Sequence, residues 1–290
     1  MKERQIHTVP LLEQAVRFQD YGVDIFNAIN SKSGLKKSIK KGLITINGVL
    51  ASTATFIKGG EVITLYELEK TKDAINPNIE LEIIYEDDYL AVINKPPGVL
   101  VSGNKLKTIV NALPYNLKES SQSDALSRPL TVHRLDFPTS GLLLVAKTNK
   151  VLISLGKMFE ENTILKTYHA VSIGSMQAKG SITNDINGKA SKTRYEVLKT
   201  IESTKYNCLN LLKLFPESGR RHQIRIHLSG IGNPILGDAT YGKDGAVLTG
   251  KGLFLCASSL EFKHPVLKNK LLIELQLPAK FRRLLSDFNV

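Results

Sequence analysis

The chain has 290 residues, of which 42% are hydrophobic and 23% charged, a composition typical of a globular protein. At about 100–200 residues per domain, this length allows one large domain, alone or with a smaller companion. Lysine and arginine outnumber aspartate and glutamate by 39 to 27, which gives a formal net charge of +12. Such a charge favours a polyanionic partner, either nucleic acid or an acidic membrane surface, although a merely basic surface gives the same count.

Several classes of protein are not expected. No apolar stretch approaches the roughly 20 residues of a membrane span, and the charged start of the chain leads into no signal-peptide core. The two cysteines, Cys208 and Cys256, lie in apolar runs and are expected to be buried free thiols, which favours a cytoplasmic protein. The histidines lack metal-ligand spacing and no phosphate-binding glycine loop is present, so we expect neither a metal nor any other cofactor.

The first domain is expected over residues 12–67, and its elements follow from apolar spacing and turn residues. In chain order they are a helix over residues 23–29 that Ser33 and Gly34 interrupt, a short helix over residues 35–41 with Gly42 at its stop, a strand over residues 43–46, a tight turn at Asn47 and Gly48, and a strand over residues 61–65.

The second predicted helix carries a basic face made of Lys36, Lys37, Lys40 and Lys41. Their spacing places them opposite Leu35 and Ile39. A solvated face is the ordinary interpretation of such a helix. The order of helix, basic helix, strand, Asn-Gly turn and strand, however, resembles the small RNA-binding module named after ribosomal small-subunit protein S-four. This resemblance implies that the four lysines bind RNA.

Residues 68–78 mix charge, asparagine and proline and are expected to form a linker to a second domain over residues 79–290. In that domain, strand-length segments outnumber helical ones and do not alternate regularly with them. This pattern predicts a mixed α+β fold with a large, mostly antiparallel sheet and flanking helices. The expected strands are residues 79–85, 89–94, 142–146, 167–173, 194–198, 208–215 and 271–277, and the expected helices are 109–113, 152–160 and 281–285.

The segment VHRLDFPTSGLLLVAKT, from Val132 to Thr148, joins polar side chains to an apolar strand. Phe137 precedes a proline and is restricted to extended geometry, and the Thr-Ser-Gly that follows favours a turn. Asp136 is therefore expected in a rigid loop at the mouth of a buried strand, where functional residues concentrate. From the residues alone, the alternative that Asp136 pairs with Arg134 or caps a turn stays open.

The same segment resembles the catalytic motif of the RluA-type pseudouridine synthases. Further segments similar to motifs of that family are DDYLAVINKPPG at residues 87–98, KTYHA at 166–170, GRRHQIRIHL at 219–228 and NPILGD at 233–238. The resemblance spans about residues 80–290. It implies the catalytic fold of these synthases and their reaction, in which a uridine base in RNA is detached at N1, turned and rejoined to the ribose through C5.

The resemblance also implies roles for three catalytic residues. Asp136 would act at the sugar–base junction, either as a nucleophile or as a base on the ribose. Arg225 would supply the cation that an ionised carboxylate needs in a partly desolvated site. Tyr168 would stack on the flipped-out uracil, and its phenol could also exchange a proton.

The remaining candidates concern binding. Arg134 resembles the residue that holds the base out of the RNA helix, and we interpret Lys95, Arg220 and Arg221 as phosphate contacts. The element that carries Arg225 is open. Helical spacing would group Ile224 with Leu228 on an apolar stripe, whereas strand alternation would group Arg225 with His227; both arrangements keep Arg225 off the apolar side.

We therefore expect a cofactor-independent pseudouridine synthase acting on structured RNA, with large-subunit ribosomal RNA as the first candidate substrate and transfer RNA as the second. We expect a monomer, with no membrane or DNA partner. A non-catalytic RNA-binding protein would share the basic face but would not need Asp136, Tyr168 and Arg225 together. A glycoside hydrolase working through Asp136 would normally use a second carboxylate, and none stands out near the motif.

Overall fold

The computed structural model describes residues 2–23, 25, 26, 29, 31–67, 76–242 and 250–286. The chain divides into two compact units, one made of Met1–Ile75 with Ser123–Leu126 and the other of Asn76–Gln122 with Ser127–Val290. Most of the predicted linker at residues 68–78 lies outside the described residues, which resume at Asn76. None of the helices in these ranges is both long enough and apolar enough to cross a membrane.

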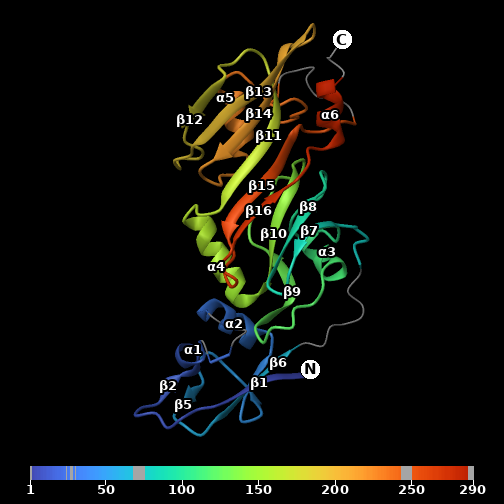
Figure 1. The fold of residues 1–290 in the computed structure, drawn as a ribbon. Helices are drawn as coiled ribbons and strands as arrows, with labels where there is room; N and C mark the ends of the chain where they lie inside the picture. The colour runs from blue at the N-terminus through green and yellow to red at the C-terminus, as the bar shows by residue number, and fades with distance from the viewer. Residues whose placement is uncertain are drawn as a thin grey trace. The chain divides into compact units, whose positions relative to one another are not determined.

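The first unit is a small α/β unit with a four-stranded sheet in the order β1-β6-β3-β4 (Figure 1). Its elements are β1 (Lys2–Thr8), β2 (Val16–Arg17), α1 (Phe18–Tyr21), α2 (Lys32–Lys40), β3 (Ile44–Ile46), β4 (Val49–Leu50), β5 (Phe56–Ile57) and β6 (Val62–Glu67). Phe18, Leu35, Ile44 and Ile63 are fully buried and form the centre of its core.

Two sequence expectations for this unit need correction. Helix α2 begins at Lys32, because the Ser31 hydroxyl accepts a hydrogen bond from the Gly34 amide (3.1 Å) and caps the helix; Ser33 and Gly34 therefore lie inside it. Residues 24, 27 and 28 of the helix expected over 23–29 lie outside the described residues, and Phe26 and Ile29 form an isolated β-bridge instead.

The turn predicted at Asn47 and Gly48 is confirmed. Both residues have positive φ angles, 49° and 80°, and connect the antiparallel strands β3 and β4. A two-residue turn with two positive φ angles has a twist that suits a β-hairpin. Asparagine and glycine occupy this turn because they adopt positive φ angles more readily than other residues.

In the described part of the chain, the second unit carries a ten-stranded sheet in the order β12-β13-β14-β11-β15-β10-β8-β7, with β16 paired to β15 and β9 to β10 (Figure 1). The strands are β7 (Glu82–Glu86), β8 (Leu90–Lys95), β9 (Ala125–Thr131), β10 (Ser140–Thr148), β11 (Leu165–Ile173), β12 (Lys179–Ile182), β13 (Thr193–Ser203), β14 (Asn207–Pro216), β15 (Leu255–Lys263) and β16 (Lys270–Glu274). Strands β10 and β15 meet in a short parallel pairing, and most of the other pairings are antiparallel. The predicted mixed fold with a large, mostly antiparallel sheet is confirmed.

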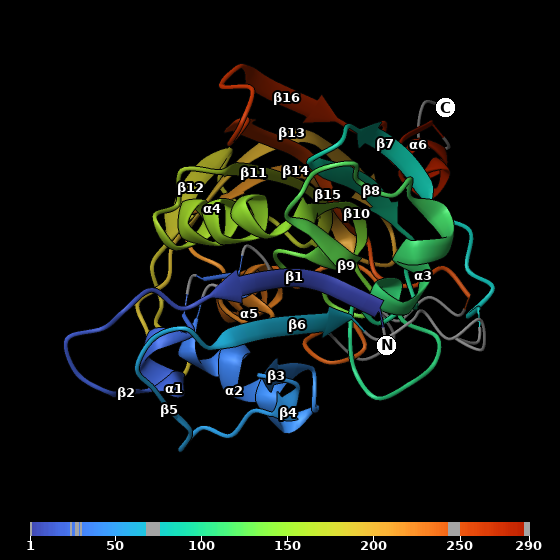
Figure 2. The same cartoon turned by 90° about the horizontal axis from the view of Figure 1, so that it is seen from below.

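Four helices flank this sheet within the described residues: α3 (Ile109–Asn116), α4 (Asn149–Glu160), α5 (Gln223–Gly230) and α6 (Ala279–Ser286). Helix α4 packs against β10, and α5 packs against β13 and β14 (Figures 1 and 2). The element that carries Arg225 is thus a helix. Both cysteines are buried free thiols, as expected, and burial raises the pKa of Cys256 to about 11.

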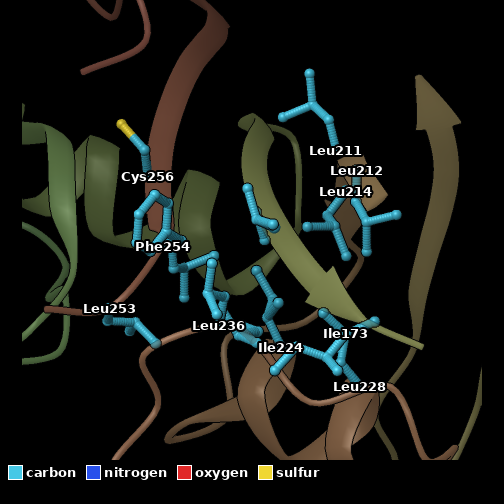
Figure 3. Packing of buried hydrophobic residues seen from close by; sticks show 14 of the residues in the cluster. Ile173, Leu211, Leu212, Leu214, Ile224, Leu228, Leu236, Leu253, Phe254 and Cys256 are labelled. Atoms are coloured by element: carbon cyan, nitrogen blue, oxygen red, sulfur yellow. The ribbon is translucent and has the colours of Figure 1, made fainter. Parts of the chain in front are cut away.

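Helix α5 is oriented by the larger of two core clusters in this unit. Ile224 and Leu228 of the helix point toward Ile173, Leu212 and Leu214 of the sheet (Figure 3). These two residues form the apolar stripe that the helical spacing predicts, so the opposite side of the first turn is left for polar side chains. Burial of this stripe therefore determines where Arg225 can point.

Candidate active site

A cavity of about 600 Å³ in the second unit collects predicted site residues from three separate parts of the sequence. These parts are the loop before β10, the start of β11 and the segment that leads into α5. The predicted site residues that line it are Arg134, Asp136, Tyr168, Arg220, Arg221 and Arg225. The motifs that are distant in sequence therefore meet in one place.

Asp136 lies in a tightly held turn between β9 and β10. The Thr139 amide donates to the carbonyl oxygen of Asp136 (3.1 Å), and the Gly98 amide donates to that of Phe137 (2.8 Å). Gly141 follows with φ 116°, and a Cβ there would overlap the backbone of Ala257 on β15, so this close approach of the two strands requires glycine. The Asp136 side chain is 18% exposed and opens to the cavity.

Lys95 does not occupy the position expected of a phosphate contact. It ends β8 fully buried, and its ammonium group donates to the carbonyl oxygens of Pro96 (2.8 Å), Val99 (2.9 Å) and Phe137 (3.4 Å). Burial lowers its pKa to about 8, against the opposing effect of Asp136. Lys95 therefore connects the Pro-Pro-Gly turn to the Asp136 loop, because its ammonium group donates hydrogen bonds to carbonyl oxygens of both segments.

Arg225 is held by two carboxylates. Its Nε and Nη2 atoms donate to the two oxygens of Asp238 (2.7 Å each), and its Nη1 lies 3.5 Å from Asp136 Oδ2. Burial acts to lower the pKa of Arg225, but the two carboxylates outweigh it and hold that pKa above its ordinary value. The structure thus brings Arg225 to Asp136, with Asp238 as the closer partner.

Asp238 was not singled out from the sequence. Its side chain is 1% exposed and accepts hydrogen bonds from the Thr240 amide (2.9 Å) and the Tyr241 amide (3.1 Å) as well as from Arg225. Burial acts to raise its pKa, but these donors outweigh burial and lower it. The available signal was its position at the end of the NPILGD segment, where a charged residue follows an apolar run.

His222 is a second residue that sequence reasoning missed. Its Nε2 lies 3.7 Å from Asp136 Oδ1, and its Nδ1 lies 2.9 Å from the Tyr241 hydroxyl. The Arg225 guanidinium also lies over the Tyr241 ring, and its Cζ atom is 5.0 Å from the ring centroid. His222 and Tyr241 therefore extend the cluster around Asp136 and Arg225.

Tyr168 lies on β11 between the two core clusters of the second unit and packs against both. Burial raises its pKa above the ordinary range, and the Asp136 charge acts in the same direction. The phenol is therefore protonated at neutral pH. Its hydroxyl makes no hydrogen bond to the described residues, so Tyr168 presents an uncharged aromatic surface to the cavity.

The remaining candidates are exposed. Arg134, Arg220 and Arg221 lie at the cavity surface; the Arg220 Nε donates to the Ala190 carbonyl (3.3 Å), and Arg134 makes no ion pair with any residue that the structure describes. The four lysines of the predicted basic face belong to the first unit, where Lys36, Lys37 and Lys40 are exposed on α2 and Lys41 follows its last turn.

A larger cavity of about 1060 Å³ in the second unit contains none of the predicted site residues. It is lined by β11, β13, β14, β15 and β16, and shares Asn162, Lys166 and Pro216 with the first cavity. His169 lines it and shares a hydrogen bond with Ser258 (2.7 Å). Because successive strand residues point to opposite faces, His169 and Tyr168 face different cavities.

Comparison with known proteins identifies the family. Residues 89–230 match the family model of RNA pseudouridylate synthases. A protein of Aquifex aeolicus described as an uncharacterized RNA pseudouridine synthase is 35% identical over 283 residues, covering 88% of this chain and 89% of that protein. The chain belongs to the RNA pseudouridine synthase family. Ribosomal large subunit pseudouridine synthase D of Nitrosomonas europaea is 33% identical, with 88% of this chain and 80% of that protein covered.

A solved structure agrees with this assignment. Human RNA pseudouridylate synthase domain containing 4 superimposes with a TM-score of 0.57 at 25% identity, covering 71% of this chain and 92% of that one. The resemblance found in the motifs is thereby confirmed, as is the enzyme class. The synthase is an isomerase, and neither the RNA-binding protein without activity nor the glycoside hydrolase describes its family.

Proposed function

We propose that this synthase isomerises uridine to pseudouridine in structured RNA through Asp136, with large-subunit ribosomal RNA as its substrate and transfer RNA as the second candidate. The observation that carries the mechanism is the meeting of Asp136, Arg225 and Tyr168 in one cavity. The proposal of ribosomal RNA is supported by the relatives named ribosomal large subunit pseudouridine synthase D.

In this mechanism a uridine leaves the RNA stack and its base lies on Tyr168, whose uncharged ring suits stacking. Asp136 then acts at C1′ as a nucleophile, or at C2′ as a base. Both routes start from the ionised carboxylate, which Arg225 stabilises from 3.5 Å. Asp238 keeps Arg225 in place by its two hydrogen bonds and does not itself reach the substrate.

Binding is assigned to two groups of cations. Arg134, Arg220 and Arg221 are exposed around the cavity and suit the phosphates next to the target uridine, with Arg134 holding the base out. Residues 12–67, in the first unit, act as an RNA-binding module through Lys36, Lys37, Lys40 and Lys41. Residues 79–290 form the catalytic domain. The absence of acidic residues between Ser31 and Gly60 supports this role.

We propose further that the synthase works in the cytoplasm as a monomer, with RNA and no DNA or membrane as its partner. Two buried free thiols suit a reducing compartment. All residues assigned to catalysis come from one chain and one unit, so no second copy is needed to complete the cavity.

The test compares the wild-type protein with the Asp136→Asn variant on large-subunit ribosomal RNA and on transfer RNA, without added metal or cofactor. The amide is nearly isosteric but can neither attack carbon nor take a proton, so conversion should fall by roughly three or more orders of magnitude. Pseudouridine mapping of both RNAs gives the site and the preferred substrate. Conversion by the variant at the wild-type rate would contradict the mechanism, and conversion of transfer RNA alone would contradict the proposed substrate.

A further inference from the structure

Phe137 is an exposed aromatic residue next to the proposed catalytic carboxylate. It is 52% exposed, and among the phenylalanines that the structure describes only Phe56, at 59%, is comparably exposed. The Arg17 guanidinium lies over the Phe56 ring, 5.7 Å from its centroid, whereas the Phe137 ring contacts no other ring and no cation of the described residues. Single exposed apolar side chains are common on protein surfaces, so only the position of Phe137 can indicate a role.

The backbone holds the Phe137 ring outside the cavity. The Thr139 amide donates to the carbonyl oxygen of Asp136 (3.1 Å), which closes the turn around the residue. The Phe137 carbonyl oxygen accepts the Gly98 amide (2.8 Å), and Pro138 restricts the backbone further. Asp136 and Thr139 line the cavity but Phe137 does not, so its exposed ring lies beside the opening on a fixed turn.

A bound RNA has to pass close to this ring. A uridine whose ribose reaches Asp136 remains bonded through its phosphates to the nucleotides on either side. Those neighbours stay outside the cavity, because only the target base leaves the stack. Consecutive Cα atoms are about 3.8 Å apart. A side chain that follows Asp136 and lies beside the opening is therefore within reach of a neighbouring nucleotide.

That neighbour has an uncovered base face once the uridine has left the stack. Flipping a base is unfavourable in part because the adjacent bases lose a stacking partner. An aromatic side chain can replace that partner, since every base has a π-face. A phenyl ring has only two side-chain dihedral angles to fix, so it gives a large contact area at a small cost in conformational entropy.

The other candidates around the cavity suit this contact less well. Tyr168 lies inside the cavity, where we place the target base itself. Arg134 is assigned to hold that base out, and the exposed guanidinium groups of Arg220 and Arg221 suit phosphates. Phe137 is apolar, exposed and beside the opening, so it is suited to the base of a neighbouring nucleotide.

We propose that Phe137 is a specificity-determining residue that stacks on the base next to the target uridine, so that this synthase prefers a purine at that position. A purine has the larger ring system, and sequence preferences of this kind come from stacking strength rather than from hydrogen bonds to base edges. This inference rests on the proposed isomerisation of uridine in RNA and deepens it. It adds a sequence preference that phosphate contacts cannot supply.

A double-mutant cycle, with one change in the protein and one in the RNA, measures this contact. The substrate is an RNA hairpin around the uridine that pseudouridine mapping identifies, made with adenine, uracil or no base on its 5′ side, and likewise on its 3′ side. Phe137→Ala should lower kcat/KM roughly 5- to 150-fold when adenine is the contacted neighbour, and should change it little when that base is absent. The preference of the wild type for adenine over uracil should disappear in this variant.

Two further variants control for general effects. Leu267→Ala shortens an apolar side chain of similar exposure, 54%, in the turn between β15 and β16, and should convert every RNA at the wild-type rate. Phe137→Trp keeps a stacking surface and should retain both the activity and the preference for adenine.

Phe137→Trp also reports stacking directly, because the chain has no tryptophan of its own. In an Asp136→Asn background, which should bind RNA without converting it, the indole emission should fall on binding the adenine RNA and change much less on binding the RNA without that base. Leu267→Trp in the same background should show no change with either RNA.

Two results would overturn this proposal alone. One is an unchanged emission of Phe137→Trp when the adenine RNA is bound. The other is an equal effect of Phe137→Ala with and without the neighbouring base, on both sides of the uridine. If the wild-type protein converted no uridine in the mapping experiment, the proposed function itself would fall, and this inference with it.

Discussion

The Arg225 guanidinium lies between the carboxylates of Asp136 and Asp238. This arrangement predicts that a substitution of Asp238, which does not line the cavity, changes both stability and activity. Asp238→Asn would leave the Arg225 guanidinium buried without its closest anion. Breaking a buried ion pair by removing one partner typically costs about 3–5 kcal/mol, so we expect the free energy of unfolding to fall by that amount in denaturant titrations. Activity should fall as well, because Arg225 would no longer be held toward Asp136.

The matched control is Glu217→Gln, the same change from carboxylate to amide at an exposed ion pair with Arg194 and Lys192. Exposed pairs contribute about 0–1 kcal/mol, so this variant should stay close to the wild type in stability and rate. Equal effects of the two substitutions would mean that Asp238 does not stabilise Arg225.

Tyr168 offers a prediction that differs from the sequence-based one. The phenol was expected to exchange a proton, but burial raises its pKa and its hydroxyl has no hydrogen-bond partner among the described residues. Tyr168→Phe keeps the ring and should retain RNA binding and most of the turnover, whereas Tyr168→Ala should lose activity through loss of stacking, worth about 1–3 kcal/mol per base. Initial rates of pseudouridine formation check both variants, and an inactive Tyr168→Phe would show that the phenol hydroxyl takes part in the reaction.

His133 predicts the pH dependence of stability. Its ring stacks on Phe159 (4.7 Å), and its Nε2 accepts the Leu144 amide; burial lowers its pKa to about 3. Between pH 3 and the unfolded value near 6.5, the unfolded chain binds a proton that the folded chain does not, so stability falls as pH falls. One such group contributes at most about 1.4 kcal/mol per pH unit. His133→Gln should flatten the pH dependence of the unfolding free energy in this window; an unchanged slope would contradict it.

At the scale of elements, sequence patterns predict segments whose neighbours are local and miss those whose neighbours are distant. The Asn47–Gly48 turn and the buried strand β10 follow from their own residues. Strand β15 was missed, because Ser258 and Ser259 break its apolar pattern and it is completed by partners far along the chain. The choice of helix for α5 needed the sheet on which Ile224 and Leu228 pack.

The same distinction applies to the site. The resemblance to a family pointed to Asp136 and Arg225 together, but local pattern could not show that Asp238 is the closer partner of Arg225 or that His222 points toward Asp136. Both facts depend on how the segment after α5 returns to the start of that helix. Lys95 was misassigned for a related reason: its burial depends on carbonyl groups of a turn and of a loop 42 residues away.

Helix α2 gives a prediction at the element scale. If its lysines contact phosphates, Lys36→Ala with Lys40→Ala should lower the slope of log affinity against log salt by roughly 1.4 to 1.8, since each phosphate contact contributes roughly 0.7 in single strands and 0.9 in B-form duplexes. The control pair, Lys105→Ala with Lys107→Ala, removes equal charge from exposed positions of the second unit. Binding isotherms at several salt concentrations give both slopes; equal slopes for the two pairs would mean that α2 presents only a solvated face.

At the scale of the whole molecule, the two units separate the proposed chemistry from the proposed docking. Every residue assigned to bond breaking or proton transfer belongs to the second unit, which has its own core clusters. The lysines of α2 belong to the first, whose separate core surrounds Leu35 and Ile44. A division of this kind implies that affinity and turnover can be changed independently.

The corresponding prediction concerns a fragment of residues 76–290. The fragment retains both core clusters of its unit, so it should fold, which circular dichroism can establish. Without the lysines of α2 it should bind RNA more weakly and with a shallower salt dependence, so KM should rise while kcat stays near the full-length value. Single-turnover kinetics at saturating RNA isolate the chemical step. A folded fragment with unchanged KM would show that the first unit adds nothing to RNA binding, and a folded fragment whose kcat falls as far as that of Asp136→Asn would show that the chemistry needs the first unit.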